Sequence, residues 1–192
     1  MRTRRILIIY GTRYGQTAKV AEYMRAALAN AGFGVLVEDA AKPRGDIDPE
    51  HYDGILIGGS LIRRHHQRAV RKYVARHRER LNRMPSAFFS VSASAASAEP
   101  RSQADAREAI QRFLTETRWD PDMVTPVAGA IAYTKYPLLM RWVLREISRR
   151  SGGPTDTSRD HELTDWAAVA ELARRFGRLV SPAPPPAVLS RS

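Results

Sequence analysis

Short apolar runs alternate with longer amphipathic stretches along most of the chain. Residues 6–9 are all Ile or Leu, which is typical of a strand buried on both faces. From Gln16 the apolar positions recur at steps of three and four residues, which predicts a helix. The alternation then repeats. We expect strands over residues 33–37, 55–57, 87–91 and 124–131, and helices over residues 68–81, 103–117 and 165–176.

Strands that alternate with helices at this spacing predict an α/β fold with a parallel sheet between two layers of helices. Right-handed crossovers favour a doubly wound, five-stranded sheet of order 2-1-3-4-5. In such sheets ligands bind beyond the carboxyl ends of the strands, where the order reverses between strands one and three. The loops expected to meet there, residues 11–17, 58–66 and 90–98, are rich in small and hydroxyl-bearing residues.

The turn after the first strand is suited to a phosphate group. A buried strand that turns directly into a helix leaves backbone N–H groups free at the helix N-terminus. Gly11 and Gly15 relieve the steric cost of the turn, and Thr12 and Thr17 add hydroxyl groups. The turn lacks both the three-glycine dinucleotide fingerprint and the Gly-Lys of nucleoside-triphosphate loops. An ordinary strand-to-helix turn, with Thr17 near the cap, is the alternative.

Composition narrows the class of protein. The 192 residues suffice for one domain with a substantial core, which we expect over residues 1–180, followed by a Pro-rich disordered tail over 181–192. Without cysteine there is no disulfide, thiol nucleophile or Cys-based metal site, and no segment is long enough to span a bilayer. The net charge of +11 favours anionic partners, although an arginine-rich genome would give the same charge.

The segment Thr12-Arg13-Tyr14-Gly15-Gln16-Thr17 resembles the phosphate loop of flavodoxins, which holds the phosphate of FMN. Further segments, spread along the chain in order, extend this similarity over about residues 5–180. They are Tyr52-Asp53, residues 57–60, residues 81–91, Ala128-Gly129-Ala130, residues 151–157 and Thr164-Asp165-Trp166. Together they resemble the family of flavodoxin-type, quinone-dependent protoporphyrinogen IX dehydrogenases, which implies a flavodoxin-like three-layer sandwich.

The resemblance implies an FMN oxidoreductase of haem biosynthesis that oxidises protoporphyrinogen IX and reduces a membrane quinone. It implies a cytoplasmic protein, peripherally attached to the inner face of the cell membrane. With one phosphate cradle and no diphosphate fingerprint, we expect FMN rather than FAD. The expected cofactor-binding residues are Thr12, Arg13, Tyr14, Gly15, Gln16 and Thr17 for the phosphate, and Ser60, Leu61, Ile62, Arg63, Ser90, Val91, Ser92, Ala93 and Ser94 for the ring. No catalytic base is assigned.

One loop departs from the family pattern. After Ser60 the chain reads Leu61-Ile62-Arg63-Arg64-His65-His66, where the family carries an aromatic residue and a glycine. An aromatic side chain there could stack on the flavin or the substrate. The departure therefore concerns the packing of the ring and leaves the phosphate site unaffected.

An insertion over residues 132–158 follows the fifth strand. It contains a predicted amphipathic helix, residues 138–150, with Arg141, Arg145, Ser148 and Arg149 along one stripe and an apolar opposite face. This helix could lie on an anionic membrane surface or simply cover the edge of the sheet. At the start of the insertion, Tyr133, Lys135 and Tyr136 are the expected substrate-binding residues, through aromatic faces and a charge for a propionate.

Rival functions are a plain electron-carrying flavodoxin and a flavin-dependent quinone or NAD(P)H reductase. Against the carrier stand the basic charge and the insertion, because such carriers are commonly acidic and lack this segment. His65 and His66 have no nearby carboxylate in sequence, so we expect no metal site. No Gly-x-Ser-x-Gly elbow is present, and the arginine-rich helix 68–80 lacks interleaved aromatics, so we expect neither hydrolase chemistry nor nucleic-acid binding. A homo-oligomer stays open.

Overall fold

A five-stranded parallel sheet forms the centre of the computed structural model, which describes residues 2–97, 99–131, 133–135, 142, 145–146, 148–149 and 154–181. The strand order is β2-β1-β3-β4-β5, as predicted. The strands are β1 (Arg5–Gly11), β2 (Gly34–Asp39), β3 (Gly54–Ser60), β4 (Ser86–Ser92) and β5 (Met123–Ala128). The register pairs Ile6 of β1 with Val35 on one side and Gly54 on the other. The predicted α/β class is therefore confirmed.

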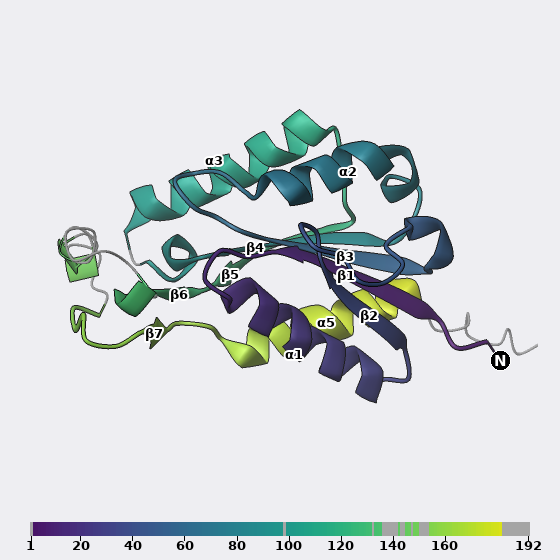
Figure 1. Cartoon of the computed structure of the whole chain (residues 1–192), viewed down its shortest axis with the longest axis horizontal. Helices are drawn as coiled ribbons and strands as arrows, with labels where there is room; N and C mark the ends of the chain where they lie inside the picture. The colour runs from purple at the N-terminus through teal and green to yellow at the C-terminus, as the bar shows by residue number, and fades with distance from the viewer. Residues whose placement is uncertain are drawn as a thin grey trace, which may run out of the picture.

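Helices cover both faces of the sheet (Figure 1). The helices α1 (Gln16–Asn30) and α5 (Trp166–Val180) lie on one face, and α2 (Arg68–Leu81) and α3 (Pro100–Thr117) lie on the other. Short 3-10 helices occur at η1 (Pro49–His51), η2 (Ala93–Ala96) and η3 (Tyr133–Lys135). The arrangement is the predicted three-layer sandwich, and it brings the loops after β1, β3 and β4 to one end of the sheet.

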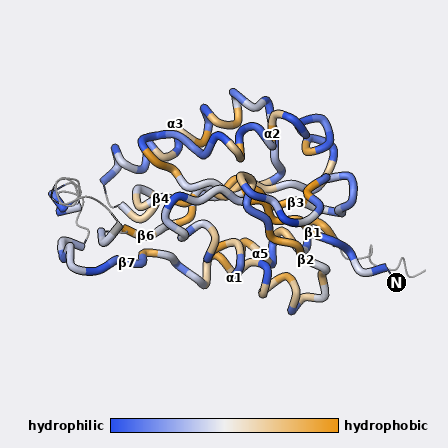
Figure 2. The backbone as a smooth tube through the Cα atoms, viewed as in Figure 1, coloured by the Kyte–Doolittle hydropathy of each residue, from blue (hydrophilic) through white to orange (hydrophobic). Residues whose placement is uncertain are grey.

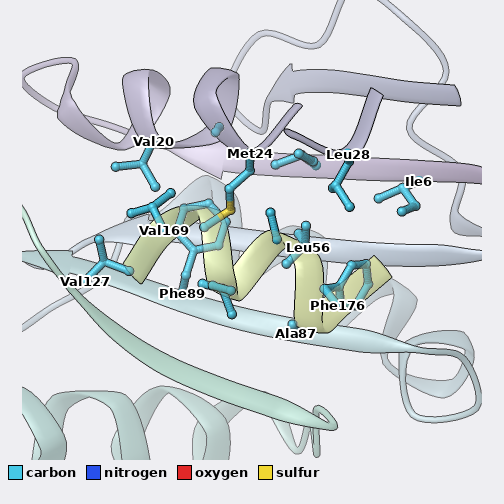
Figure 3. Close-up of a cluster of buried hydrophobic side chains, with 14 of the residues drawn as sticks. Ile6, Val20, Met24, Leu28, Leu56, Ala87, Phe89, Val127, Val169 and Phe176 are labelled. Atoms are coloured by element: carbon cyan, nitrogen blue, oxygen red, sulfur yellow. The ribbon is translucent and has the colours of Figure 1, made fainter. Parts of the chain in front are cut away.

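The core consists of two apolar layers, one on each face of the sheet. Between the sheet and the α1–α5 pair, Met24, Phe89 and Phe176 pack together with no exposed surface (Figure 3). On the other face, Phe88 stacks on Phe113 of α3 with ring centroids 4.6 Å apart. Each fully buried side chain of this size contributes about 1.5–3 kcal/mol to folding. The sheet is thus a rigid base for the loops at its carboxyl end.

Helix α2 has the amphipathic character that its sequence predicts. Val70, Tyr73, Val74 and Leu81 are buried against the sheet. The outer face carries the arginines, and Figure 2 shows this helix as largely hydrophilic beside the more hydrophobic strands. The basic run over residues 68–80 is therefore a solvated helix face.

The predicted fifth strand, residues 124–131, is wrong in one respect, because it is two strands. β5 ends at Ala128, and β6 (Ala130–Ile131) pairs in antiparallel fashion with β7 (His161–Glu162). The break lies at Gly129, whose N–H donates to Ser92 O at 3.0 Å while its carbonyl accepts from Leu163 N at 2.9 Å. The chain that returns from the insertion thus replaces β4 as the partner. Figure 1 shows β6 and β7 beyond the carboxyl end of the sheet.

Other boundaries differ by a few residues. Helix α3 begins at Pro100, three residues before the predicted start, because proline suits the first helical position. Strand β2 begins at Gly34 and continues to Asp39. These shifts move no side chain of the expected site.

Much of the predicted helix 138–150 lies outside the described residues, including Arg141. Of its described members, Trp142 is 66% exposed, and Arg145 and Arg149 are also exposed. Ser148, predicted on the arginine stripe, is instead buried and donates from Oγ to Pro154 O at 2.7 Å. The expected tail also lies outside the described part, from residue 182 onward, so the division into residues 1–180 and 181–192 stays a prediction. Within the described chain, no helix is long and apolar enough to cross a membrane.

Candidate functional site

The loops after β1, β3 and β4 form a pocket of about 100 Å³ at the carboxyl end of the sheet. Gly129, between β5 and β6, and Ala130, the first residue of β6, also line it. The lining residues are Thr12, Tyr14, Gln16, Thr17, Ser60, Leu61, Ile62, Val91, Ser92, Ala93, Gly129 and Ala130. The pocket lies where β1 and β3 meet, which is the switch point that the strand order predicts.

The phosphate loop, residues 12–17, is held in shape by its first and fourth residues. Gly15 takes the left-handed conformation, with φ of 98°, and its N–H donates to Thr12 Oγ1 at 2.9 Å. A side chain with Cβ would be strained at this φ. Gly15 is also the N-cap of α1, and no side chain caps the helix there. The first-turn N–H groups of α1 therefore have no partner within the helix and can bind an anion.

Thr17 supplies the strongest sign of a ligand. The residue is fully buried, and its Oγ1 has no hydrogen-bond partner among the described residues. An unpaired buried hydroxyl costs about 1–3 kcal/mol, so proteins rarely retain one without a use. Because Thr17 lines the pocket at the uncapped start of α1, a phosphate oxygen placed there would satisfy both the hydroxyl and the amides. The residues present thus fit a phosphate-bearing cofactor.

A hydrogen-bonded chain connects the phosphate loop to the segment that returns from the insertion. Gln16 Nε2 donates to Thr164 Oγ1 at 2.8 Å, and Thr164 Oγ1 donates to Ala128 O at 2.8 Å. Lys19, one turn into α1, forms an ion pair with Glu162 of β7 at 3.6 Å. The start of α1 is therefore positioned by residues about 150 positions further along the chain.

The β3 loop, residues 61–67, forms the opposite wall through a tight reverse turn. Ile62 and His65 exchange two backbone hydrogen bonds of 3.0 Å each. Arg63 and Arg64 at the centre of the turn have φ of 48° and 66°. Two successive left-handed residues define a type I′ turn, which normally requires Asn or Gly. The turn is therefore strained and must be held by other contacts.

Three sets of contacts hold this turn. Arg64 pairs with Asp105 at 3.2 Å and with Glu108 at 2.6 Å, both on α3. Leu61 N donates to Val91 O at 2.8 Å. Gln67 Nε2 donates to Ser60 Oγ, which closes the loop at its base. The β3 loop is thus connected to α3, to β4 and to itself.

His66 anchors the loop from below. It is 8% exposed, lies edge-on to Phe88 and Phe113, and its Nε2 is 2.9 Å from Ser90 Oγ. Burial, and to a smaller extent the neighbouring His65, lowers the pKa of His66 to about 4. The His66 ring is therefore neutral at physiological pH, and it packs against the two phenylalanines while forming one hydrogen bond.

Most of the predicted cofactor residues line the pocket, and the others lie beside it. Arg13 lines a neighbouring cleft, Arg63 is exposed at the tip of the turn, and Gly15 shapes the phosphate loop. Ser90 is buried beneath the loop with His66, and Ser94 lies within η2. Direct contact with a cofactor stays a prediction for all fifteen residues, including the ten that line the pocket.

Of the three predicted substrate-binding residues, the structure describes the side chain of Tyr133 alone. The Tyr133 ring is fully buried, its hydroxyl donates to Pro154 O at 2.8 Å, and it meets His161 edge-on. It therefore joins the two ends of the insertion, and its contact with a substrate stays a prediction. Lys135 belongs to η3, and nothing further is described of its side chain. Tyr136 lies outside the described residues.

Sequence reasoning missed Gly129, Ala130, Thr164 and His66 as contributors to the site. Gly129 and Ala130 are small residues that follow a strand, and that signal could have placed them beside the other loops. Thr164 and His66 act through partners that are distant in sequence, namely Gln16 and Ser90. In the described part of the chain, no group of three or more His, Asp or Glu side chains could hold a metal ion.

Comparisons with known proteins agree with this geometry. A family model described as "Flavodoxin domain" matches residues 7–158. Protoporphyrinogen IX dehydrogenase [quinone] of Escherichia coli K12 is 36% identical over 175 residues, which cover 90% of this chain and 94% of that protein. The protein of the same name from Leishmania major is 31% identical over 188 residues, covering 93% of this chain and 77% of that one.

A solved structure supports the fold. The oxidised flavodoxin 1 of Bacillus cereus superposes with a TM-score of 0.54 at 15% identity, covering 90% of this chain and 96% of that one. At this identity the likeness concerns the fold alone. The sequence relatives are at least twice as identical to this chain over a similar share of its length.

Proposed function

Because the chain belongs to the flavodoxin domain family, we propose that it is an FMN-dependent oxidoreductase that converts protoporphyrinogen IX to protoporphyrin IX. The electron acceptor is a membrane quinone, and the reaction serves haem biosynthesis. The observation that carries the cofactor assignment is the buried, unpartnered Thr17 hydroxyl at the uncapped start of α1. The substrate and acceptor are those in the names of the relatives at 36% and 31% identity.

Different residues of the pocket bind the phosphate and the ring of the cofactor. The first-turn amides of α1, with Thr12 and Thr17, hold the phosphate of FMN. Residues 60–62 and 91–93 flank its ring. When bound, FMN supplies the redox chemistry, taking hydrogen from the substrate and passing electrons to the quinone. The chain orients both molecules, and the apolar side chains of Leu61, Ile62 and Val91 exclude water from one side of the pocket.

The test is a spectrum followed by an assay. The purified protein should show flavin absorbance, and the released cofactor should be FMN and not FAD. With a quinone present, the flavin-loaded protein should generate protoporphyrin fluorescence from protoporphyrinogen IX faster than the spontaneous reaction. A protein without flavin, or a flavoprotein that does not accelerate porphyrin formation, contradicts the proposal.

The same assay separates two rival functions. An electron-carrying flavodoxin would bind FMN and exchange electrons with a chemical reductant, yet form no porphyrin. A flavin-dependent reductase would consume NAD(P)H or reduce quinone without protoporphyrinogen. The net charge of +11 and the residues inserted between β6 and β7 favour the dehydrogenase, since common carriers are acidic and lack such a segment.

We also propose peripheral attachment to the cytoplasmic face of the membrane, where quinone is available. The exposed Trp142 and Arg145 support this, because aromatic and arginine side chains bind the lipid interface. Arg149 is paired with Glu146 at 2.7 Å and should contribute less. Flotation with anionic vesicles should succeed at low salt and fail at high salt, at about 1 kcal/mol per unpaired arginine. Equal flotation with neutral vesicles would remove the electrostatic part of this proposal.

A further inference from the structure

A second hollow adjoins the cofactor pocket. It has a volume of about 490 Å³ and lies between the phosphate loop and the start of α2. Thr12 and Ile62 line both hollows, so the two are separated by little more than these side chains. The remaining lining residues are Arg13, His65, His66, Gln67 and Arg68. We call this hollow the arginine cleft.

The arginine cleft carries uncompensated positive charge. Its described lining includes Arg13 and Arg68 and no carboxylate. Among the described residues, neither arginine has a carboxylate within 4.0 Å, although Arg13 lies 5.9 Å from the Tyr14 ring centroid. Arg64, between the two in sequence, is instead bound to α3 through Asp105 and Glu108. One arginine of the region thus holds the fold, while two are available for an anionic ligand.

The shape and composition of the cleft suit one side group of a larger ligand. Ile62 is half-buried on the boundary of the two hollows and can contact an apolar body at the mouth of the cofactor pocket, while Arg13 and Arg68 line the hollow beyond it. Guanidinium groups bind carboxylates in a planar, bidentate manner. A molecule whose apolar macrocycle lies over Ile62 at the mouth of the cofactor pocket, beside the bound cofactor, could therefore place a carboxylate on a short arm in the arginine cleft.

We propose that the arginine cleft is the carboxylate subsite of the substrate, with Arg68 as its principal residue and Arg13 as the second. The proposal rests on the proposed function and assigns the propionate end of the substrate to one side of the β3 loop. Arg68 stands at the first position of α2 and lines the arginine cleft, and it forms no ion pair with a residue that the structure describes. It can be changed without altering the phosphate loop.

Another basic hollow of the molecule serves as an internal comparison. It has about 580 Å³ and is lined by Arg76, Arg80 and Arg83 near the end of α2. Eight residues of helix, about 12 Å, separate Arg76 from Arg68. In that hollow Arg80 is paired with Glu50 at 3.3 Å, and no residue is shared with the cofactor pocket. Replacing an arginine of this hollow should therefore not change the affinity for a ligand bound beside the flavin.

The experiment compares Arg68→Gln with Arg76→Gln in the flavin-loaded protein. Protoporphyrin IX and its dimethyl ester, in which both carboxylates are masked, are titrated against each variant by fluorescence. Arg68→Gln should raise the Kd of the diacid about threefold and leave that of the ester unchanged. Adding Arg13→Gln should bring the loss to about tenfold, with flavin content measured alongside. Arg76→Gln, which removes the same charge elsewhere, should change neither.

Turnover gives an independent readout. A contact with a distant carboxylate contributes equally to binding of the ground state and of the transition state. Arg68→Gln should therefore raise KM for protoporphyrinogen IX and leave kcat unchanged. Equal loss in Arg68→Gln and Arg76→Gln, equal affinity of the unaltered protein for diacid and ester, or no binding of either overturns the subsite. If the unaltered protein forms no porphyrin, the proposed function itself fails, and this result differs from the three that overturn the subsite.

Discussion

The phosphate loop and the β3 loop face each other across one pocket, and they are stabilised in opposite ways. The phosphate loop leaves polar groups unpaired, namely the Thr17 hydroxyl and the first-turn amides of α1. The β3 loop is held mainly by paired groups, through the Ile62–His65 hydrogen bonds and the ion pairs of Arg64 with α3, although the buried Oε1 of Gln67 at its end has no hydrogen-bond partner among the described residues. A binding loop cannot pair its own donors without losing its ligand, whereas a wall that only shapes the pocket can.

This difference predicts two kinds of response to mutation. Removing the unpaired Thr17 hydroxyl from the phosphate loop should reduce cofactor affinity and leave the stability of the cofactor-free protein almost intact. Changes in the β3 loop should alter stability first and affinity only through the shape of the pocket. Residues that join the two loops to the rest of the fold should show both effects.

The largest effect is expected in the phosphate loop. Replacing Thr12 and Thr17 by alanine removes two hydroxyls from the phosphate site. Since a hydrogen bond to a charged group contributes about 1.5–3 kcal/mol, the affinity for FMN should fall by about 3–6 kcal/mol. Flavin fluorescence on titration measures this directly.

The matched control is the Thr12→Ser, Thr17→Ser protein, which keeps both hydroxyls and should retain flavin. Thr17→Ala alone should leave the cofactor-free protein nearly as stable as before, because the hydroxyl it removes has no partner there. Full flavin retention by the double alanine variant would be inconsistent with the phosphate site.

The next effect concerns the pH dependence of stability through His66. Its pKa in the folded protein is about 4, below the ordinary value of 6.5, so the unfolded chain binds a proton first as the pH falls. The contribution of His66 is therefore zero above pH 6.5 and becomes increasingly unfavourable down to about pH 4. At about 1.4 kcal/mol per pKa unit the total is about 3 kcal/mol.

His66→Gln isolates this effect, because glutamine can still bond to Ser90 and does not titrate. Unfolding by urea should show a constant difference in the free energy of unfolding between the two proteins above pH 6.5. Between pH 6.5 and 4 the protein with His66 should lose about 3 kcal/mol relative to the His66→Gln variant. Two parallel curves over this range would mean that His66 is not buried as a neutral ring.

A smaller effect is expected at Thr164, which connects the phosphate loop to β5. Thr164→Val keeps the size of the side chain and removes its hydrogen bonds with Gln16 and Ala128. We expect a stability loss of about 1–2 kcal/mol and a weaker, secondary loss of flavin affinity. Thr164→Ser should restore both. If only stability changed, the link would support the fold without positioning the phosphate loop.

How far the sequence predicts this molecule depends on the range of each interaction. The strands, their order and the phosphate loop follow from local periodicity and the handedness of crossovers, and the structure confirms the fold. The β6–β7 pair was missed because two-residue strands carry no periodicity. The role of His66 was missed because Ser90, Phe88 and Phe113 reach it only in the folded chain.

The turn at Arg63-Arg64 is the clearest limit of local rules. Turn chemistry demands glycine or asparagine at these positions, so two arginines argue against a type I′ turn. Tertiary contacts override that preference, through the pairing of Arg64 with α3 and the burial of His66. No window of sequence around the turn contains Asp105 or Glu108, and so none could predict it.

The smallest predicted effect tests this override by treating the two arginines as a matched pair. Both have left-handed φ, which costs about 1–2 kcal/mol for a residue with Cβ, and glycine would remove that cost. Glycine also adds about 0.5–1 kcal/mol of chain entropy to the unfolded state.

Arg63 forms no ion pair with a described residue, so Arg63→Gly should stabilise the protein by about 0.5–1 kcal/mol. Arg64→Gly gains the same relief but loses two exposed ion pairs, each of about 0.2–1 kcal/mol, and should be close to neutral. Thermal unfolding of the cofactor-free variants measures the difference. Equal stabilisation by both would show that the α3 ion pairs contribute nothing, and that the β3 loop is held by its backbone hydrogen bonds, the Gln67–Ser60 bond and the burial of His66.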